Sequence, residues 1–312
     1  MQQPNARPFR FGHQLRPTGP VDELIAEAQR AEAAGFDVVT IPDHIGDSMV
    51  SPMVLAAAIA RETESVRIST FVLNNEMRNP VQLAWEAAAV DRLSNGRFEL
   101  GIGAGHTPHE FAATGIPMRP ATERKARLAE AVEILQALFA GATVTRSGAH
   151  YSIEGAAIEP PTQPRLPILV GGNGRSLLTH AGAHADIVGL NGLSKTLDDG
   201  HRHSLNWSPE RLDVQVQRVH EGAVGRDQLP ELNALVQRVE ITDDRAASAG
   251  AIAEQAEGLT TDDALAAPYL FLGTHDEIAA QCHAARERWG ISYFVTRDID
   301  NMTPVVAALR GS

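Results

Sequence analysis

Cysteine and positive charge are both scarce in this sequence. Of the 312 residues only Cys282 is a cysteine, which excludes an internal disulfide and a cysteine-cluster metal site and fits a reducing compartment. The 27 lysines and arginines are outnumbered by 39 aspartates and glutamates, so the formal net charge is −12. Long-range repulsion would oppose binding to nucleic acid or to an anionic membrane, and we expect neither as a partner.

Long apolar runs are also missing. The first residues, MQQPNARPFRFG, contain no run of signal-peptide length, and no segment reaches the ~20 apolar residues that span a bilayer. We therefore expect a cytoplasmic protein. Hydrophobic residues nevertheless make up 43% of the chain, which is enough to bury a large core.

Short apolar segments alternate with helical patterns along the chain. The expected strands cover residues 9–15, 37–41, 66–72, 97–102, 167–170, 185–190, 234–241 and 291–296, and the helices 21–34, 51–61, 80–93, 122–139, 175–183, 243–257 and 276–289. Eight nearly uninterrupted apolar strands predict a parallel sheet covered on both faces, and eight is the number that closes a barrel. An open doubly wound sheet is the alternative, although the Gly-x-Gly-x-x-Gly signal is missing after the first strand.

We therefore predict an α/β fold, a (β/α)8 TIM barrel formed by a single domain over residues 1–312. Two inserted segments interrupt the alternation, near residues 141–165 and 191–208. The first has the pattern of a small hairpin. Both are expected to line the mouth, which we define as the end of the barrel where the strands have their C-termini, and to influence specificity there.

Glycines follow the fourth expected strand at the point where an active site would lie. Gly103 and Gly105 precede His106, and a residue without Cβ lets the backbone approach a ligand. Glycines that only make a turn are the alternative, which the residues alone slightly favour. His106 is expected to point into the mouth.

A second glycine-rich loop, Gly171–Gly172–Asn173–Gly174, directly precedes a helix. Backbone N–H groups and the helix dipole at such a place favour an anion such as phosphate. An ordinary strand-to-helix turn is the alternative.

Polar residues follow two other strands. Asp43 and His44 come after the second strand, and a histidine there could exchange a proton near neutral pH, whereas a helix cap and a structurally bonded imidazole are the alternatives. Asn74 could hydrogen-bond a heterocycle or satisfy loop backbone. Glu110 could act as a base, but capping the next segment suits it better.

The remaining histidines do not indicate a metal site, and we expect no metal. They include His180, His184, His201, His203, His220 and His283. His201-x-His203 could reach one metal only from an ordered strand, whereas its surroundings are typical of a loop.

Together these motifs resemble the luciferase-like monooxygenase superfamily, and within it the actinobacterial coenzyme F420-dependent oxidoreductases. The similarity runs from Arg7 to Leu309 and is most specific over residues 66–117. It is carried by Phe11-Gly12, Pro42-Asp43-His44, Val72-Leu73-Asn74-Asn75-x-x-Arg78-Asn79-Pro80, Asp91-x-Leu93-Ser94-x-Gly96-Arg97-Phe98, Gly101-x-Gly103-Ala104-Gly105, Glu110, Gly115-Ile116-Pro117 and Gly171-Gly172.

The resemblance implies a barrel that binds coenzyme F420, or alternatively FMN, at its mouth. It implies a non-prolyl cis peptide at Thr70-Phe71 or Phe71-Val72, beside the ring of the cofactor. The residues implied to hold the cofactor are Asp43, His44, Thr70, Phe71, Val72, Asn74, Gly103, Gly105, Gly171, Gly172 and Asn173, with Asp43 orienting His44 or contacting the ring.

The function implied is hydride transfer between C5 of F420 and a small organic substrate. His44 is expected to give or take the proton, and His106 to face the substrate as a polar or second acid-base group. The sugar-phosphate dehydrogenases of this family have a glutamate where this chain has His106, which puts a sugar-phosphate substrate in doubt.

Two other functions and two protein partners are also considered. The alternatives are an FMNH2-dependent monooxygenase that uses O2 and a barrel that binds a cofactor or metabolite without turnover. The resemblance further implies a homodimer, with a reductase that supplies reduced flavin or F420 as a further partner.

Overall fold

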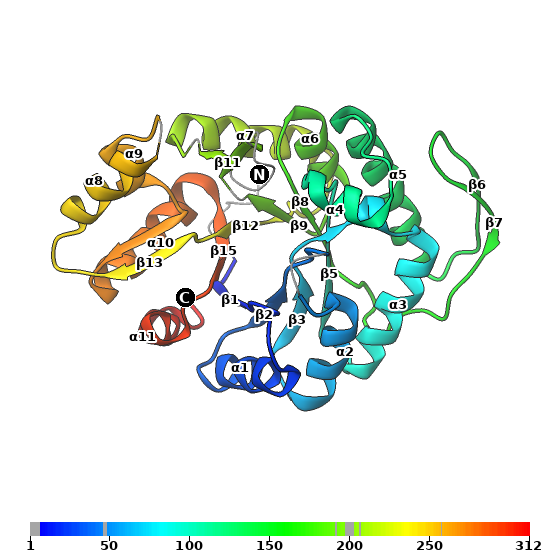
Figure 1. The fold of residues 1–312 in the computed structure, drawn as a ribbon, viewed down its shortest axis with the longest axis horizontal. Helices are drawn as coiled ribbons and strands as arrows, with labels where there is room; N and C mark the ends of the chain where they lie inside the picture. The colour runs from blue at the N-terminus through cyan, green and yellow to red at the C-terminus, as the bar shows by residue number, and fades with distance from the viewer. Residues whose placement is uncertain (1–6, 46–48, 191, 197–202, 206, 257) are drawn as a thin grey trace.

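The computed structural model describes residues 7–45, 49–190, 192–196, 203–205, 207–256 and 258–312 (Figure 1). Eight parallel strands pair in the order β3-β2-β1-β15-β12-β9-β8-β5, and a further pairing of β5 with β3 closes the ring. They are β1 (Arg10–Gln14), β2 (Val38–Ile41), β3 (Arg67–Thr70), β5 (Phe98–Gly103), β8 (Ile168–Gly171), β9 (Ile187–Leu190), β12 (Glu231–Leu235) and β15 (Ile291–Thr296). The predicted (β/α)8 barrel is confirmed, and the open sheet is excluded.

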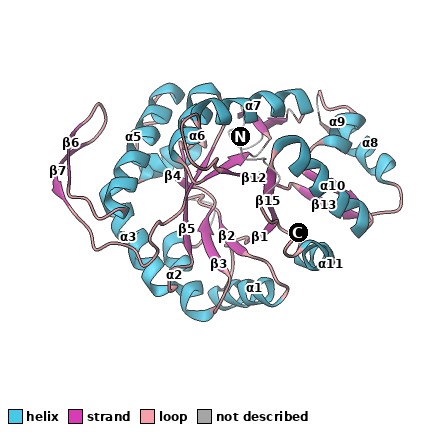
Figure 2. Ribbon diagram, turned by 180° about the vertical axis from the view of Figure 1, so that it is seen from behind, coloured by secondary structure: helices cyan, strands magenta, loops and turns pink. Residues whose placement is uncertain are grey.

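Helices surround the strands on the outside of the barrel (Figure 2). They are α1 (Val21–Ala33), α2 (Pro52–Glu62), α3 (Pro80–Leu93), α4 (Pro108–Thr114), α5 (Ala121–Phe139), α6 (Arg175–His184), α7 (Pro209–Gly222), α10 (His275–Trp289) and α11 (Ile299–Leu309). Every residue of β5 and of β15 is buried, because one face of each strand packs on helices and the other fills the barrel. In the described part of the chain, no helix is long and apolar enough to cross a membrane.

Helix ends are set by local sequence. Asn79 caps α3 by accepting bonds from the backbone N–H groups of Val81 and Gln82, and Pro80 occupies the first turn. At α10, Thr274 and Glu277 form a capping box. These signals explain why the expected bounds of both helices agree with the structure to within one residue.

The expected seventh strand, residues 234–241, is wrong as a single element. The barrel strand β12 ends at Leu235, and β13 (Arg238–Ile241) pairs in parallel with β14 (Leu270–Gly273) in a separate small sheet. Apolar residues continue through the junction, so the pattern alone did not show the break. With α8 (Arg245–Gln255) and α9 (Thr261–Ala266), this small sheet forms an insertion before β15.

The third barrel strand is interrupted beside the mouth. It ends at Thr70, and β4 (Leu73–Asn74) then continues along β5. The peptide bond between them, Phe71-Val72, is cis, which is one of the two positions expected from the resemblance. The side chain of Val72 lies against Gly103 and Gly171. A Cβ on Gly103 would lie 2.8 Å from a methyl carbon of Val72, and a Cβ on Gly171 would lie 3.1 Å from the other. Both glycines therefore make room for Val72.

The inserted segments differ in position. Residues 141–165 contain the expected hairpin, β6 (Val144–Ser147) and β7 (Ser152–Ala156), which projects from the outer edge of the barrel near α3 and α5 (Figure 1). The expectation that this segment lines the mouth is wrong, since none of its residues contributes to the cavity described below. In the second segment, β10 (Leu193–Thr196) pairs with β11 (His203–Leu205), while residues 191, 197–202 and 206, including His201, lie outside the described residues.

Candidate active site

A cavity of about 660 Å³ opens at the mouth of the barrel. Its volume is within the range of pockets that hold small molecules and cofactors. The cavity is lined by eleven of the residues singled out from the sequence, namely Asp43, His44, Phe71, Val72, Asn74, Gly103, Gly105, His106, Gly171, Gly172 and Asn173. The rule that active sites gather at the C-terminal ends of barrel strands accounts for this convergence.

Thr70 is the exception. Its hydroxyl donates to the carbonyl of Gly101 at 2.8 Å and accepts from the Gly101 N–H at 2.9 Å, and the side chain is fully buried between β3 and β5. The expectation that Thr70 contacts the cofactor is therefore wrong. Thr70 instead holds β3 to β5 immediately before the cis peptide.

His44 is held by Glu110. The His44 Nδ1 lies 2.7 Å from Glu110 Oε1, and the other carboxylate oxygen accepts from Asn74 Nδ2 at 3.4 Å. The Glu110 side chain is 3% exposed, whereas that of His44 is 34% exposed. When Nδ1 carries the proton and donates it to Glu110, Nε2 is the nitrogen that can accept a proton. The arrangement can therefore perform acid-base chemistry at Nε2.

The expectation that Glu110 caps a helix is wrong, and of the two roles expected for Asp43, orienting His44 or contacting the ring, the first is wrong. Glu110 lies in the first turn of α4, but its carboxylate bonds His44 and Asn74. The Asp43 carboxylate accepts from Arg78 Nη1 at 2.6 Å and from the Asn74 N–H at 2.9 Å. Asp43 thus fixes the backbone of Asn74, a task the sequence did not reveal.

His106 lies next to His44 at the mouth. The two rings are edge to face, with centroids 6.3 Å apart and an interplanar angle of 89°. His106 is exposed, so it can meet a molecule that enters the cavity. Gly105 has a φ of +69°, and a Cβ there would come within 2.2 Å of Asn74 Oδ1. Glycine at this position lets the loop carry His106 across the Asn74 side chain.

One wall of the cavity is suited to an anion. Gly172, Asn173 and the N-terminus of α6 lie on this side, and Lys125 Nζ is 2.9 Å from the position that a Cβ on Gly174 would take. Asn173 Oδ1 accepts from Gln215 at 2.9 Å. Burial lowers the pKa of Arg124, which donates to the Gly105 carbonyl beside them. Backbone N–H groups, a helix N-terminus and an ammonium together form a typical phosphate site.

The opposite wall carries two arginines that sequence analysis missed. Arg16 follows β1 and Arg297 follows β15, and both line the main cavity together with Gln237. The signal was present, since each arginine comes directly after a barrel strand. Burial and the neighbouring charge of Arg16 lower the pKa of Arg297.

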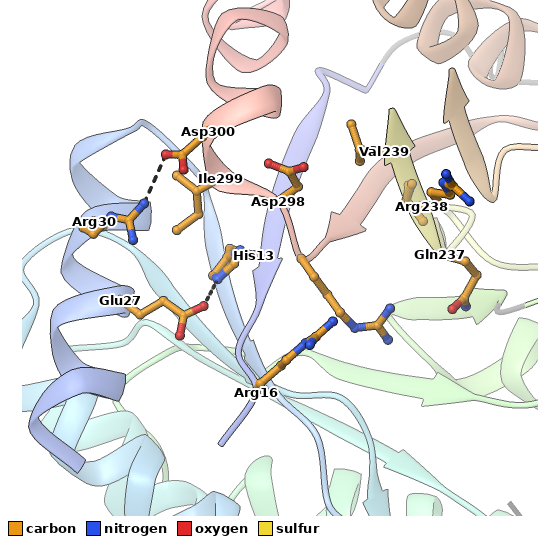
Figure 3. A pocket seen from close by; sticks show the side chains of 12 residues that line it. His13, Arg16, Glu27, Arg30, Gln237, Arg238, Val239, Asp298, Ile299 and Asp300 are labelled. Atoms are coloured by element: carbon orange, nitrogen blue, oxygen red, sulfur yellow. Dashed lines mark hydrogen bonds and ion pairs between the residues drawn. The ribbon is translucent and has the colours of Figure 1, made fainter. Parts of the chain in front are cut away.

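Arg16 also faces a smaller hollow of about 390 Å³ that adjoins the main cavity (Figure 3). The acidic groups in this hollow are engaged elsewhere: Glu27 with His13 at 2.7 Å, Asp300 with Arg30 at 3.1 Å, and Asp298 with the N-terminus of α11. Neither Arg16 nor Arg297 has a hydrogen bond or ion pair from its guanidinium to any residue that the structure describes. Two positive charges without a partner in the described part of the chain therefore face the cavity.

Away from the mouth, His180 and His184 lie with Glu133 in a group of side chains whose ligand atoms are close enough to hold a metal ion. The third member comes from a different helix, so spacing along the sequence did not reveal the group.

Comparison with known families identifies the protein family of this barrel. The family model for luciferase-like monooxygenase matches residues 6–203. The chain belongs to the luciferase-like monooxygenase family. The resemblance inferred from the motifs is confirmed at this level.

Relatives in the luciferase-like family include F420-dependent enzymes. The chain is 35% identical over 171 residues to an F420-dependent glucose-6-phosphate dehydrogenase from Beutenbergia cavernae, an alignment that covers 53% of this chain and 51% of the relative. The chain thus matches about half the length of this curated relative.

Solved structures of other proteins share the whole fold. An F420-dependent secondary alcohol dehydrogenase in complex with an F420-acetone adduct matches with a TM-score of 0.77 and 21% identity, covering 97% of this chain and 100% of that one. The monooxygenase RslO1 from Streptomyces bottropensis matches with a TM-score of 0.71 and 22% identity, covering 96% of each chain. Because both reaction classes use this fold, the fold alone does not choose between them.

Proposed function

We propose that this protein is an F420-dependent oxidoreductase that transfers a hydride between C5 of the deazaflavin and a small organic substrate. The observation that carries the proposal is the cavity itself, where a histidine held by a buried carboxylate lies between a phosphate-type wall and a second cationic wall. The similarity to F420-dependent dehydrogenases favours F420 over FMN.

The residues of the cavity fit this cofactor. Phe71, Val72 and Asn74 would hold the ring, and Gly172 with Lys125 would hold the phosphate. When bound, F420 supplies hydride chemistry at C5. His44 gives or takes the proton of the substrate at Nε2, and Glu110 keeps its imidazole in the required tautomer and orientation.

Anaerobic turnover tests the reaction class. Reduced F420 is mixed with the protein and a panel of enones, imines and ketones, and oxidised F420 with alcohols, in the absence of O2. Cofactor turnover that depends on substrate supports the oxidoreductase. Turnover that requires O2 and reduced FMN would support the monooxygenase instead, and binding without any turnover would support the barrel that only binds.

Lys125→Ala is expected to weaken F420 binding by about 10- to 100-fold, because a charge-assisted hydrogen bond contributes about 1.5–3 kcal/mol. Fluorescence titration measures the affinity, and a deazaflavin that lacks the phosphate tail should bind both proteins equally. Arg218→Ala, which removes an equal charge from the outer surface of α7, is the control. Equal affinity of wild type and Lys125→Ala for F420 would place the phosphate elsewhere.

The positive charge of the second cationic wall favours a substrate that carries a carboxylate or phosphate. Arg16 and Arg297 lie across the cavity from Lys125, since β1 and β15 are neighbours in the barrel and are distant from β5 and β8. Glucose 6-phosphate, in the name of the Beutenbergia cavernae relative, is one such anion. We propose only that the substrate is an organic anion and not that it is a sugar phosphate, because this chain has His106 where the sugar-phosphate dehydrogenases have a glutamate.

Replacing Arg16 or Arg297 with alanine is expected to raise KM for an anionic substrate by about 10- to 100-fold, as for loss of one hydrogen bond between charged groups. Steady-state kinetics with an anionic substrate and its neutral ester measures the effect, and the ester should be unaffected. A loss of F420 affinity with unchanged KM would show instead that the arginines bind the cofactor.

A further inference from the structure

Two histidines and a glutamate meet on the outside of the barrel. His180 and His184 lie one turn apart on α6, and Glu133 lies on α5 beside it (Figure 1). The two imidazole rings stack, with centroids 4.3 Å apart and an interplanar angle of 23°. One ligand atom from each of the three residues lies within 4.8 Å of the other two. Small side-chain adjustments would bring them to a common ion.

His180 offers a ring nitrogen to an ion. Its Nε2 is buried and has no hydrogen-bond partner among the described residues. A buried nitrogen without a partner otherwise lowers stability.

Glu133 and His184 complete the set. Glu133 uses Oε2 to accept from Arg146 at 2.9 Å, and Oε1 has no bond to any described residue. Arg146 also forms an ion pair with Glu130, which reduces the electrostatic repulsion between Arg146 and a nearby cation. The ring nitrogens of His184 have no hydrogen bond within the described part of the chain, so a ligand atom is available on each residue.

We propose that Glu133, His180 and His184 form a zinc site that joins α5 to α6, with water as the fourth ligand. Imidazole and carboxylate are ordinary zinc ligands, and three protein ligands with one open position are compatible with tetrahedral zinc. The same two helices carry Lys125 and the Gly174 N-cap on the phosphate-type wall. The ion would therefore fasten together the helices that support this wall.

Isothermal titration of the chelator-treated, full-length protein with zinc chloride tests the site. We expect one zinc per chain, and the wild-type melting temperature should rise with zinc. His184→Gln and Glu133→Gln should each weaken binding by at least about 10- to 100-fold, which is the effect of losing even an indirect partner of a metal site. Both residues are only partly buried, so these variants should remain folded. Cobalt in place of zinc should give tetrahedral visible absorption in the wild type but not in His184→Gln or Glu133→Gln.

His220→Ala is the matched control, because it removes a single histidine from the neighbouring helix α7. It should bind zinc as the wild type does. The proposal is overturned if the wild-type protein binds no zinc, or if both His184→Gln and Glu133→Gln bind it with wild-type affinity. Neither result would affect the proposed oxidoreductase, which is measured separately at the mouth.

Discussion

His44→Gln is expected to lower kcat by about 100- to 10,000-fold, the usual contribution of a positioned acid-base group. The amide keeps the size of the side chain but cannot exchange a proton near neutral pH. F420 should bind the variant with nearly normal affinity, because the phosphate-type wall is unchanged. Anaerobic stopped-flow kinetics measures the rate, and fluorescence titration measures the affinity.

Glu110→Gln separates positioning from proton transfer. Glu110 bonds His44 Nδ1 at 2.7 Å and is almost fully buried, so its carboxylate holds the imidazole in one orientation. We expect a smaller loss of kcat than for His44→Gln. Full turnover by His44→Gln with an unchanged pH profile would rule out His44 as the proton donor or acceptor.

Glu99→Gln is expected to destabilise the protein by about 3–5 kcal/mol, as measured for buried ion pairs that lose one partner. Glu99 on β5 is 2% exposed, lies 2.5 Å from Arg10 Nη2 and also bonds Arg67. Burial disfavours its charge, but the two arginines outweigh burial and keep the pKa of Glu99 below its usual value. Removal of the carboxylate leaves both guanidinium groups without this partner. Urea unfolding measures the change.

The pH dependence gives a second test of Glu99. A carboxyl group with a lowered pKa stabilises the folded state above its unfolded pKa, and this contribution is lost as pH falls through the folded pKa. The stability difference between wild type and Glu99→Gln should therefore be largest near neutral pH and shrink in acid. Glu221→Gln, which loses a surface pair with Arg218 and a surface hydrogen bond from Gln217, should cost about 0–1 kcal/mol. Equal effects of the two variants would contradict the account.

Residues at strand ends could be predicted from the sequence because a parallel barrel brings all those ends to one place. His44, Asn74 and His106 follow three different barrel strands, β2, β3 and β5, and still line one cavity. The resemblance added the cis peptide, which no propensity would have indicated. Arg16 and Arg297 were missed, although they follow the first and last barrel strands, because neither belongs to a recognised motif.

Pairings between distant residues could not be predicted. Glu110 was expected to cap a helix, and only the packing of α4 against the loop after β2 places it on His44. The break after Leu235 was hidden because the apolar pattern runs on through β13. The group on α5 and α6 needed Glu133, which is 47 residues before His180 in the chain. Helical spacing alone gave no reason to join them.

The central claim, that the cavity at the mouth holds a deazaflavin, is tested most directly by parallel titration of the purified protein with F420 and with FMN. Each cofactor is added in its oxidised and reduced forms, and binding is followed by fluorescence and sedimentation. The account predicts micromolar or tighter binding of F420 and much weaker binding of FMN. Tight binding of reduced FMN with weak binding of F420 would contradict it.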